Sequence, residues 1–396
     1  MSDQGQSPAG PFSGVTVVDL TRVLAGPYCT MVLADLGARV VKVETPDTGD
    51  DARHIGPFVN GKSAYFMSLN RGKESIALDL RDDKDKGVFK RLLERADVLV
   101  ENFRPGTMER LGLGFETLAS EFPRLIYAAA SGFGHTGPAA SRPAYDMVVQ
   151  AMGGIMSLTG HPGGPPTRVG TSIGDITAGL FTAVGIASAL YHRSLGGMGM
   201  KIDVAMFDCQ IAILENAIAR YLATGAVPGP LGARHPTITP FDAFKTRDRY
   251  IVIAAGNDRL FGRLCETLGR ADLGDNPLFV SNESRTRHAA ALKDEIEAAL
   301  AARAGAEWLA ALEAAGIPCG PINTVADALA DPQTAARNMI IAVDDPVAGR
   351  LQMAGNPIKL SAFPDPPERK PAPDLGQHQD RIASELEDKS AARGKS

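Results

Sequence analysis

Continuous apolar runs alternate with amphipathic stretches over the first 130 residues of the chain. The apolar runs predict buried strands at residues 14–20, 39–44, 96–100 and 125–130. The stretches at 25–36 and 84–95 have the spacing of helices that bury one face. Strands that are apolar throughout and alternate with helices are typical of a parallel sheet covered on both faces. We therefore expect an α/β fold in this part of the chain.

An apolar run of sixteen residues at 176–191 predicts a buried helix rather than a transmembrane helix, because a bilayer span needs about 20 residues. The pattern changes after residue 223. A stretch rich in proline and glycine at 224–240 reads as a linker. The remaining elements that we expect are strands at 201–204, 241–245 and 250–255 and helices at 206–223, 258–268, 283–303 and 307–315. We infer a large domain from residues 1–225 and 326–396 and a smaller α+β domain from residues 226–325.

Charge and cysteine usage narrow the class of protein. The net charge is −5 and the basic residues are scattered, so we expect no nucleic-acid partner. The four cysteines lie far apart and form no C-x-x-C pair, which argues against a zinc site or a disulfide framework. The first residues are polar and lack the apolar segment of a signal peptide. We expect a cytoplasmic protein with no membrane partner.

Two common ligand motifs do not occur in the sequence. There is no G-x-G-x-x-G after the first strand and no H-E-x-x-H. The Rossmann-like pattern therefore lacks a nicotinamide fingerprint, and we expect neither a metal nor a redox cofactor. Open α/β sheets bind their ligands at the carboxyl ends of the strands, so another kind of ligand is expected there.

Asp175 is the strongest candidate for a catalytic group. It directly precedes the apolar helix and follows Gly170 and Gly174. Aspartate is a favoured N-cap residue, which would explain this position without any chemistry. The free N–H groups and the partial positive charge of a helix N-terminus also stabilise a carboxylate, so we expect Asp175 to be ionised at neutral pH. An ionised carboxylate beside small residues can act as a nucleophile toward a bulky ligand.

Ordered motifs along almost the whole chain resemble the class III CoA-transferases, the superfamily of formyl-CoA transferase, carnitine CoA-transferase and methylacyl-CoA racemase. The motifs are TRVLAGPYCTMVLADLGARVVKVE, NRGKESIALDLR, VENFRPG, SRPAYDMVVQAMGG, GTSIGD, GPIN and LGQH. The resemblance implies a Rossmann-like large domain built from both chain ends, a small domain, and a homodimer of two interlocked chains. It also implies that the cofactor-like substrate is coenzyme A or an acyl-CoA.

The resemblance assigns roles to individual residues. Asp175 matches the aspartate that becomes acylated. The positions that match CoA-contacting segments are Val23, Leu24, Leu78, Arg81, Asn102, Phe103, Arg104, Arg110, Ala144, Tyr145 and Asp146. The arginines among them suit the phosphates of CoA, because a guanidinium group binds phosphate through two hydrogen bonds. Several relatives carry an arginine where this chain has Thr45, and Lys42 is our candidate to hold the adenine end instead.

The superfamily contains two chemistries, CoA transfer and racemisation. A racemase needs a base on each face of an α-carbon, and the resemblance places one of them at a histidine position that is Tyr145 here. A tyrosine hydroxyl is a poor base at neutral pH. His135 lies ten residues away, in a glycine-rich loop. We therefore favour transfer through an aspartyl anhydride over a 2-methylacyl-CoA racemase or a protein that only binds acyl-CoA.

Two segments resemble the subgroup that uses succinyl-CoA and C4–C5 dicarboxylates such as glutarate. They are GDDARHIGPF near residue 50 and PFDAFKTRDRYIVIAAGN near residue 250. A dicarboxylate has one carboxylate that does not react and needs a cation, for which Arg53 and His54 are our candidates. The loop at Gly256 could offer backbone N–H groups to the substrate. A formyl-CoA:oxalate type of transferase is the alternative.

Overall fold

The computed structural model describes residues 10–388. Contacts within the chain divide it into two compact units. The large unit contains residues 10–156, 168–226 and 332–388, and the small unit contains residues 157–167 and 227–331. The segment 157–167 was not foreseen as part of the small unit, because it lies far from residues 227–331 along the chain.

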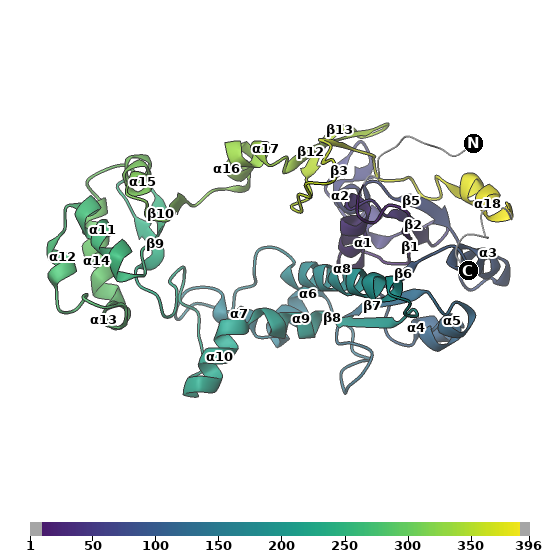
Figure 1. Ribbon diagram of the computed structural model, residues 1–396, viewed down its shortest axis with the longest axis horizontal. Coiled ribbons are helices and arrows are strands. Elements are labelled where there is room, and N and C mark those ends of the chain that lie inside the picture. The colour runs from purple at the N-terminus through teal and green to yellow at the C-terminus, as the bar shows by residue number, and fades with distance from the viewer. Residues whose placement is uncertain (1–9, 389–396) are drawn as a thin grey trace. The chain divides into compact units, whose positions relative to one another are not determined.

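A six-stranded parallel sheet forms the centre of the large unit (Figure 1). Its strands, in spatial order, are β5 (Glu74–Ala77), β2 (Arg39–Glu44), β1 (Thr16–Asp19), β6 (Val98–Glu101), β7 (Ile126–Ser131) and β8 (Lys201–Ala205). The register is fixed by pairs such as Val18 with Val41 and Val18 with Leu99. This is the strand order of a Rossmann fold, in which the direction of strand addition reverses between the first and fourth strands, here β1 and β6.

Helices cover both faces of the sheet. Alternate residues of a strand point to opposite faces. Val17, Val40 and Val98 pack with helices α1 (Ala25–Asp35) and α8 (Ile173–Ser194). Their neighbours in sequence pack instead with α3 (Asp83–Leu93) and with α18 (Gln379–Glu387), which comes from near the C-terminus. The large unit is therefore built from both ends of the chain.

Shorter elements complete the large unit. They are η1 (Asp51–His54), β3 (Phe58–Val59), β4 (Lys62–Ser63), α2 (Ala64–Asn70), α4 (Thr107–Arg110), α5 (Phe115–Glu121), α6 (Asp146–Met152), α7 (Ile155–Leu158, whose last residues belong to the small unit), α9 (Met206–Ile213), α10 (Glu215–Thr224), α17 (Pro332–Ala336), β12 (Ile340–Asp345), β13 (Gly349–Ala354) and β14 (Glu368–Arg369). The single helix expected at 206–223 is two helices, because the backbone of Glu215 leaves the helical region with φ of 20°.

The small unit is an α+β structure. An antiparallel sheet joins β9 (Phe241–Lys245), β10 (Tyr250–Ala254) and β11 (Cys319–Pro321), so the strands predicted at 241–245 and 250–255 are confirmed and pair as a hairpin. The helices are α11 (Asp258–Leu268), α12 (Asp272–Asp275), α13 (Asn282–Arg287), α14 (Ala289–Leu300), α15 (Gly305–Ala314) and α16 (Val325–Ala330). The helix expected at 283–303 is divided at His288, whose φ of −110° and ψ of 30° interrupt it.

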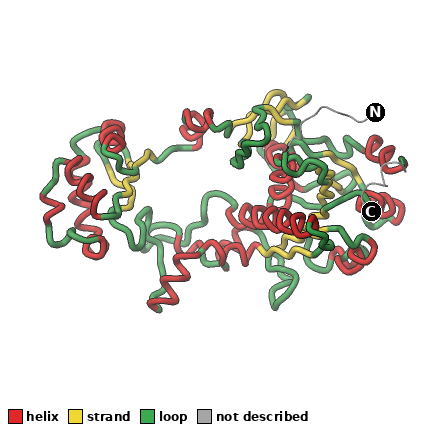
Figure 2. Tube along the Cα trace, viewed as in Figure 1, coloured by secondary structure: helices red, strands yellow, loops and turns green. Residues whose placement is uncertain are grey.

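Helix α8 differs from its prediction in two ways (Figure 2). It has 22 residues rather than sixteen, and it is only partly buried, with Phe181 and Val184 exposed in this single chain. By length and composition it could cross a bilayer, a test that the core helix of a soluble protein also passes. Here α8 packs along α1 and against β7.

Candidate active site

Asp175 lies in the first turn of α8 rather than at the N-cap. The helix begins at Ile173, with Ser172 in the N-cap position and no hydrogen bond from the Ser172 side chain to the helix. Asp175 is therefore the third helical residue, and its carboxylate is half-buried. The alternative explanation of Asp175 as the N-cap residue does not hold, because Ser172 occupies that position.

Asp146, the first residue of α6, supplies the capping hydrogen bond. One oxygen of its buried carboxylate, Oδ1, accepts a hydrogen bond from the Gly174 N–H at 2.8 Å. The other, Oδ2, accepts one from Gln150 Nε2 at 2.7 Å. A side chain at residue 174 would place Cβ 2.8 Å from Val149 Cγ2 and 3.0 Å from Asp146 Oδ1. Glycine at this position therefore allows the N-terminal ends of α6 and α8 to meet.

The surroundings of Asp175 disfavour its charge. Burial, and secondarily the negative charge of Asp146, raise the pKa of Asp175 to about 7. Burial and Asp146 thus oppose the full ionisation that we expected at neutral pH. A carboxyl group with this pKa is available as a carboxylate at neutral pH, and it is less well stabilised by its surroundings than an exposed one.

Tyr65, in the first turn of α2, is affected by the charge of Asp175, and sequence reasoning missed it. Burial and the charges of Asp175, Asp50 and Asp146 raise the pKa of Tyr65 to about 12, so its hydroxyl stays protonated at neutral pH. A protonated hydroxyl beside a reactive carboxyl group can donate a hydrogen bond to an oxygen that gains charge. The sequence gives no sign of this role, because Tyr65 lies 110 positions before Asp175 in an unremarkable aromatic and aliphatic stretch.

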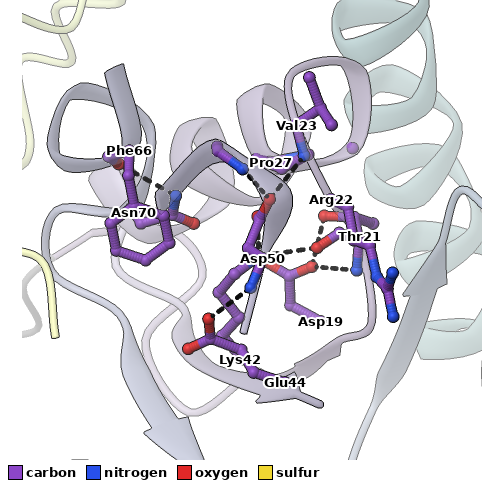
Figure 3. A network of polar contacts seen from close by, with 12 residues as sticks. Asp19, Thr21, Arg22, Val23, Pro27, Lys42, Glu44, Asp50, Phe66 and Asn70 are labelled. Carbon is purple, nitrogen blue, oxygen red and sulfur yellow. Dashed lines mark hydrogen bonds and ion pairs between the residues drawn. The ribbon is translucent and has the colours of Figure 1, made fainter. Parts of the chain in front are cut away.

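A strained turn after β1 carries the predicted CoA residues Val23 and Leu24 (Figure 3). Val23 has a φ of 66°, which a β-branched side chain rarely adopts. Its N–H donates to Asp50 Oδ1 at 3.0 Å, and Asp50 is paired with Lys42 at 2.9 Å. Lys42 Nζ also donates to the Thr21 carbonyl at 2.7 Å. Lys42 is fully buried in these contacts, so it cannot hold the adenine end of CoA as we had supposed.

The start of α8 lies beside the start of α1. A Cβ on Gly179, one turn after Asp175, would be 2.7 Å from the Ala25 carbonyl oxygen and 3.3 Å from Cys29 N. Such an approach requires the two helix backbones to be nearly in contact. Leu24, in the N-cap position of α1, is buried there. Asp175 and the Val23–Leu24 turn therefore lie in the same region of the large unit.

Five of the other predicted CoA residues follow the carboxyl ends of parallel strands, which meet at one edge of the sheet. Leu78 and Arg81 follow β5, and Asn102, Phe103 and Arg104 follow β6. The Leu78 side chain packs into the core, which leaves only its backbone for a ligand. Buried Glu101 holds the β6 loop, since its carboxylate accepts the Phe103 N–H at 2.8 Å.

The predicted CoA residues with charged or aromatic side chains differ in their exposure and in their hydrogen bonds. Arg81 is exposed but makes two hydrogen bonds to Asp79, both 2.9 Å long. Arg110, in α4, donates to Thr107 Oγ1 at 2.9 Å, and Arg104 is exposed. Ala144 is half-buried against Gly132, and Tyr145 is 78% exposed before α6.

Arg53 and His54 are not free cations. The Arg53 guanidinium group donates to both carboxylate oxygens of Glu44, at 2.7 and 2.8 Å, and to the Pro373 carbonyl at 3.1 Å. It also stacks on the Phe66 ring at 3.8 Å. His54 Nε2 lies 3.0 Å from the Thr48 carbonyl oxygen. This geometry argues against our assignment of Arg53 to a substrate carboxylate, because Glu44 already occupies that position.

Gly256 lies in the small unit, in the turn from β10 to α11. Asn257 caps α11 by accepting the Leu260 N–H at 2.9 Å, and a side chain at residue 256 would collide with Ile238. The buried Arg285 donates to the Gly256 carbonyl at 3.3 Å and to Asp258 Oδ1 at 2.8 Å. The turn borders a cavity of about 570 Å³ within this unit. The hydrogen bonds of Asn257 and Arg285 thus fix the turn from β10 to α11 in place.

Known proteins resemble this chain over nearly its full length. The family model described as CoA-transferase family III matches residues 12–379. The acetyl-CoA:oxalate CoA-transferase of Acetobacter aceti is 51% identical over 371 residues, which are 93% of this chain and 94% of that protein. The succinyl-CoA:glutarate CoA-transferase of Mus musculus is 39% identical over 377 residues, 95% of this chain and 86% of that protein. A CAIB/BAIF family protein from Brucella suis, which has a crystal structure, is 42% identical in sequence to this chain. The structural match has a TM-score of 0.83 and covers 95% of this chain and 99% of that chain.

Proposed function

The chain belongs to CoA-transferase family III, and from that premise we propose that it moves CoA from a small acyl-CoA to a small dicarboxylate with Asp175 as the nucleophile. One observation carries the proposal. Asp175 is half-buried at a helix start, and burial together with Asp146 raises its pKa to about 7. Such a carboxylate is less well solvated than one in water, which favours its use as a nucleophile.

The proposed reaction proceeds through covalent steps. The Asp175 carboxylate attacks the thioester carbonyl, and the C–S bond breaks. CoA leaves as a thiolate, and a mixed anhydride of Asp175 and the donor acid remains. The thiolate attacks the Asp175 carbonyl, which releases the donor acid and forms an aspartyl-CoA thioester. The acceptor carboxylate attacks this thioester and forms a second anhydride with release of thiolate. The thiolate then attacks the acceptor carbonyl, giving the new acyl-CoA and free Asp175.

The residues around Asp175 have distinct tasks in this proposal. Asp146 and Gly174 fix the first turn of α8 and thereby the direction of the Asp175 side chain. The Tyr65 hydroxyl stays protonated and donates to an oxygen that becomes negative during the attack. Because an anhydride hydrolyses, the site must exclude water while the intermediate exists.

The acceptor is proposed from the named relatives. Oxalate and glutarate, which appear in the names of two relatives, are both dicarboxylates, with two and five carbons. We propose acceptors in this C2–C5 range and succinyl-CoA as a donor. Glu44 neutralises Arg53, so we no longer assign Arg53 to the distal carboxylate.

A matrix of donors and acceptors tests the function. Acetyl-, formyl- and succinyl-CoA are each combined with oxalate, succinate, glutarate and acetate, and the new thioester is followed by chromatography. We expect transfer to dicarboxylates and a hydroxylamine-trapped adduct on the peptide that contains Asp175. Absence of transfer in every combination would reject the proposal. Deuterium exchange at the α-carbon of a 2-methylacyl-CoA would favour the racemase instead.

We also propose that the protein is a homodimer of interlocked chains. The family resemblance implies this assembly. Apolar side chains on α8 and α6 are exposed in the single chain, among them Phe181, Val184 and Met147. Val184 is 62% exposed although it is apolar and lies in the middle of α8. Exposed apolar groups on neighbouring helices are typical of a surface that another chain covers.

A further inference from the structure

Gln150 is a fully buried polar residue on α6, one turn after Asp146. A carboxamide taken out of water destabilises the fold unless its N–H groups and its oxygen find partners. Nε2 donates to Asp146 Oδ2 at 2.7 Å and to the Thr171 carbonyl at 3.4 Å. Oε1 accepts the Val169 N–H at 2.9 Å. Both ends of the carboxamide are thus in use, and its shortest hydrogen bond is the one to the Asp146 carboxylate.

These hydrogen bonds join two segments that meet at the start of α8. The chain re-enters the large unit just before Val169 and reaches α8 a few residues later. Gln150 holds this connection at Val169 and at Thr171. The Asp146 carboxylate, which Gln150 orients, accepts the Gly174 N–H at 2.8 Å. One carboxamide therefore restrains both the connection and the residue that caps the helix.

The connection itself packs loosely. Arg168 and Gly170 are exposed, and a Cβ on Gly170 would have no heavy atom of residues 10–388 within 4 Å. The Arg168 guanidinium group donates to the carbonyls of Val169 and Gly170, which belong to the same connection, at 3.0 and 2.8 Å. Glycine has more conformational freedom to lose than any other residue, so ordering this stretch needs a contact from outside it. Gln150, which comes from α6, provides such a contact.

Gln150 also acts on a charge. A hydrogen bond from an N–H group favours the charged form of a carboxylate. The bond from Gln150 therefore favours a negative Asp146 next to the start of α8. Burial is the main cause that raises the pKa of Asp175 to about 7, and the charge of Asp146 is the second cause. The same carboxamide thus influences both the direction and the charge of Asp175.

We propose that Gln150 is a positioning residue for CoA transfer, which fixes the connection and the Asp146 cap so that the Asp175 carboxylate is aimed at the thioester carbonyl. The proposal rests on the proposed function for the identity of the reaction. Gln150 is fully buried, so it acts through Asp146 and the backbone rather than on the substrate. A misplacement of about 1 Å can cost a reaction about 10²-fold in rate, so the role belongs to kcat rather than to KM.

The first test removes the hydrogen bonds and keeps the size of the side chain. In Gln150→Met we expect kcat to fall about 10²-fold, with the KM for succinyl-CoA near that of the wild type. Gln210→Met is the matched control. Gln210 is also fully buried, donates to Thr177 of α8 at 3.3 Å, and has an Oε1 without a hydrogen-bond partner among residues 10–388. This variant should keep the wild-type kcat.

Gln150→Glu gives a readout that a loss of packing would not give. The new carboxyl group takes the place of the N–H that bonds Asp146, and two carboxyl groups so close share one proton. Near pH 6 the shared proton replaces the lost N–H and the pair keeps a single negative charge, so kcat should approach that of the wild type at the same pH. As the pH rises and this proton leaves, the two charges repel, and kcat should fall below the level wild-type profile.

Hydrogen exchange at the Val169 and Gly174 amides needs no turnover. We expect faster exchange at both amides in Gln150→Met and wild-type exchange in Gln210→Met. A wild-type kcat or unchanged exchange in Gln150→Met would overturn the inference. So would a kcat of Gln150→Glu near pH 6 that is as low as that of Gln150→Met, or about 10²-fold below wild type if Gln150→Met does not fold. If the wild type transfers no CoA while exchange still rises in Gln150→Met, the proposed function fails and the restraint by Gln150 stands.

Discussion

The Asp175 carboxyl group is in an environment that opposes its charge, and the rate of reaction should reflect this. Burial and Asp146 raise the pKa of Asp175 to about 7, and only the carboxylate can attack a thioester. We therefore expect kcat/KM to rise about ten-fold per pH unit below that pKa and to level off above it. A pH profile with a stable acyl-CoA donor measures the midpoint.

The variant Asp146→Asn tests the cause of this midpoint. Asparagine keeps an oxygen for the Gly174 N–H but removes the negative charge, and it loses the hydrogen bond from Gln150. The repulsion on Asp175 disappears, so the midpoint of kcat/KM should move to lower pH. A midpoint that stays in place would show that burial alone sets the pKa of Asp175.

The variant Asp175→Asn separates chemistry from stability. Without its nucleophile the protein should lose transfer activity by at least about 10³-fold. The folded-state pKa of Asp175 is raised above the unfolded value, so the folded protein holds a proton that the unfolded chain has released between these two values. In the wild type this group therefore lowers the free energy of unfolding as pH rises toward 7.

Asp175→Asn should accordingly have a higher free energy of unfolding than the wild type at pH 8, by up to about 4 kcal/mol. This difference between variant and wild type, the stability gap, should shrink toward pH 5. Urea unfolding at both pH values measures the gap. Asp83→Asn, whose wild-type carboxylate is 96% exposed, is the control and should show no such gap. A gap of constant size for Asp175→Asn would contradict the assigned pKa.

At the scale of elements, the crossing of α1 and α8 depends on Gly179. Alanine is normally better than glycine inside a helix by about 1 kcal/mol. At residue 179, however, a methyl group would meet the Ala25 carbonyl oxygen at 2.7 Å, and a backbone atom cannot move aside cheaply. Gly179→Ala should therefore lower the free energy of unfolding by about 1–3 kcal/mol.

Gly87→Ala is the matched control for this crossing. Gly87 lies inside α3 of the same unit, where a methyl group would have only the end of Arg91 within reach, at 3.9 Å. This variant should be as stable as the wild type or more stable. If thermal or urea unfolding ranks the two variants in the opposite order, the close approach of α1 and α8 is not as described.

Elements whose bounds depend on residues close in sequence were predictable from the sequence. The strand β2 has the predicted bounds, 39–44, because Val40, Val41 and Val43 are β-branched residues that favour a buried strand. The start of α8 was not predictable, because its cap is Asp146, which lies 28 residues before Gly174. The ion pair of Arg53 was not predictable for a similar reason. Its partner Glu44 is near in sequence, but only the folded structure brings the two side chains into contact.

On the scale of the whole molecule, the parallel order of strands was implied by the alternation of apolar runs and helices. It gathers residues after β1, β5 and β6 at one edge, which is why the predicted CoA residues fall together. Membership of segment 157–167 in the small unit could not be foreseen, since no pattern in that segment marks its contacts. Tyr65 escaped notice likewise, because its significance depends only on nearby carboxylates.

The connection between the two units bears on assembly. The chain leaves the large unit after residue 226, builds most of the small unit, and returns at residue 332. A chain that departs from a domain and returns to it can enclose a second chain, as the proposed interlocked dimer requires. Two such chains can separate only if one of them unfolds, whereas an ordinary dimer dissociates and re-forms on dilution.

Subunit exchange distinguishes these two cases. Tagged and untagged protein, purified separately, are mixed at nanomolar concentration for a day, and the tagged protein is then recovered by affinity. We expect dimers by mass photometry and no untagged chain in the recovered fraction. After unfolding in urea and joint refolding, mixed dimers should form, because the chains can then interlock at random. Exchange without unfolding would leave a dimer but reject interlocking, and a stable monomer at these concentrations would reject both.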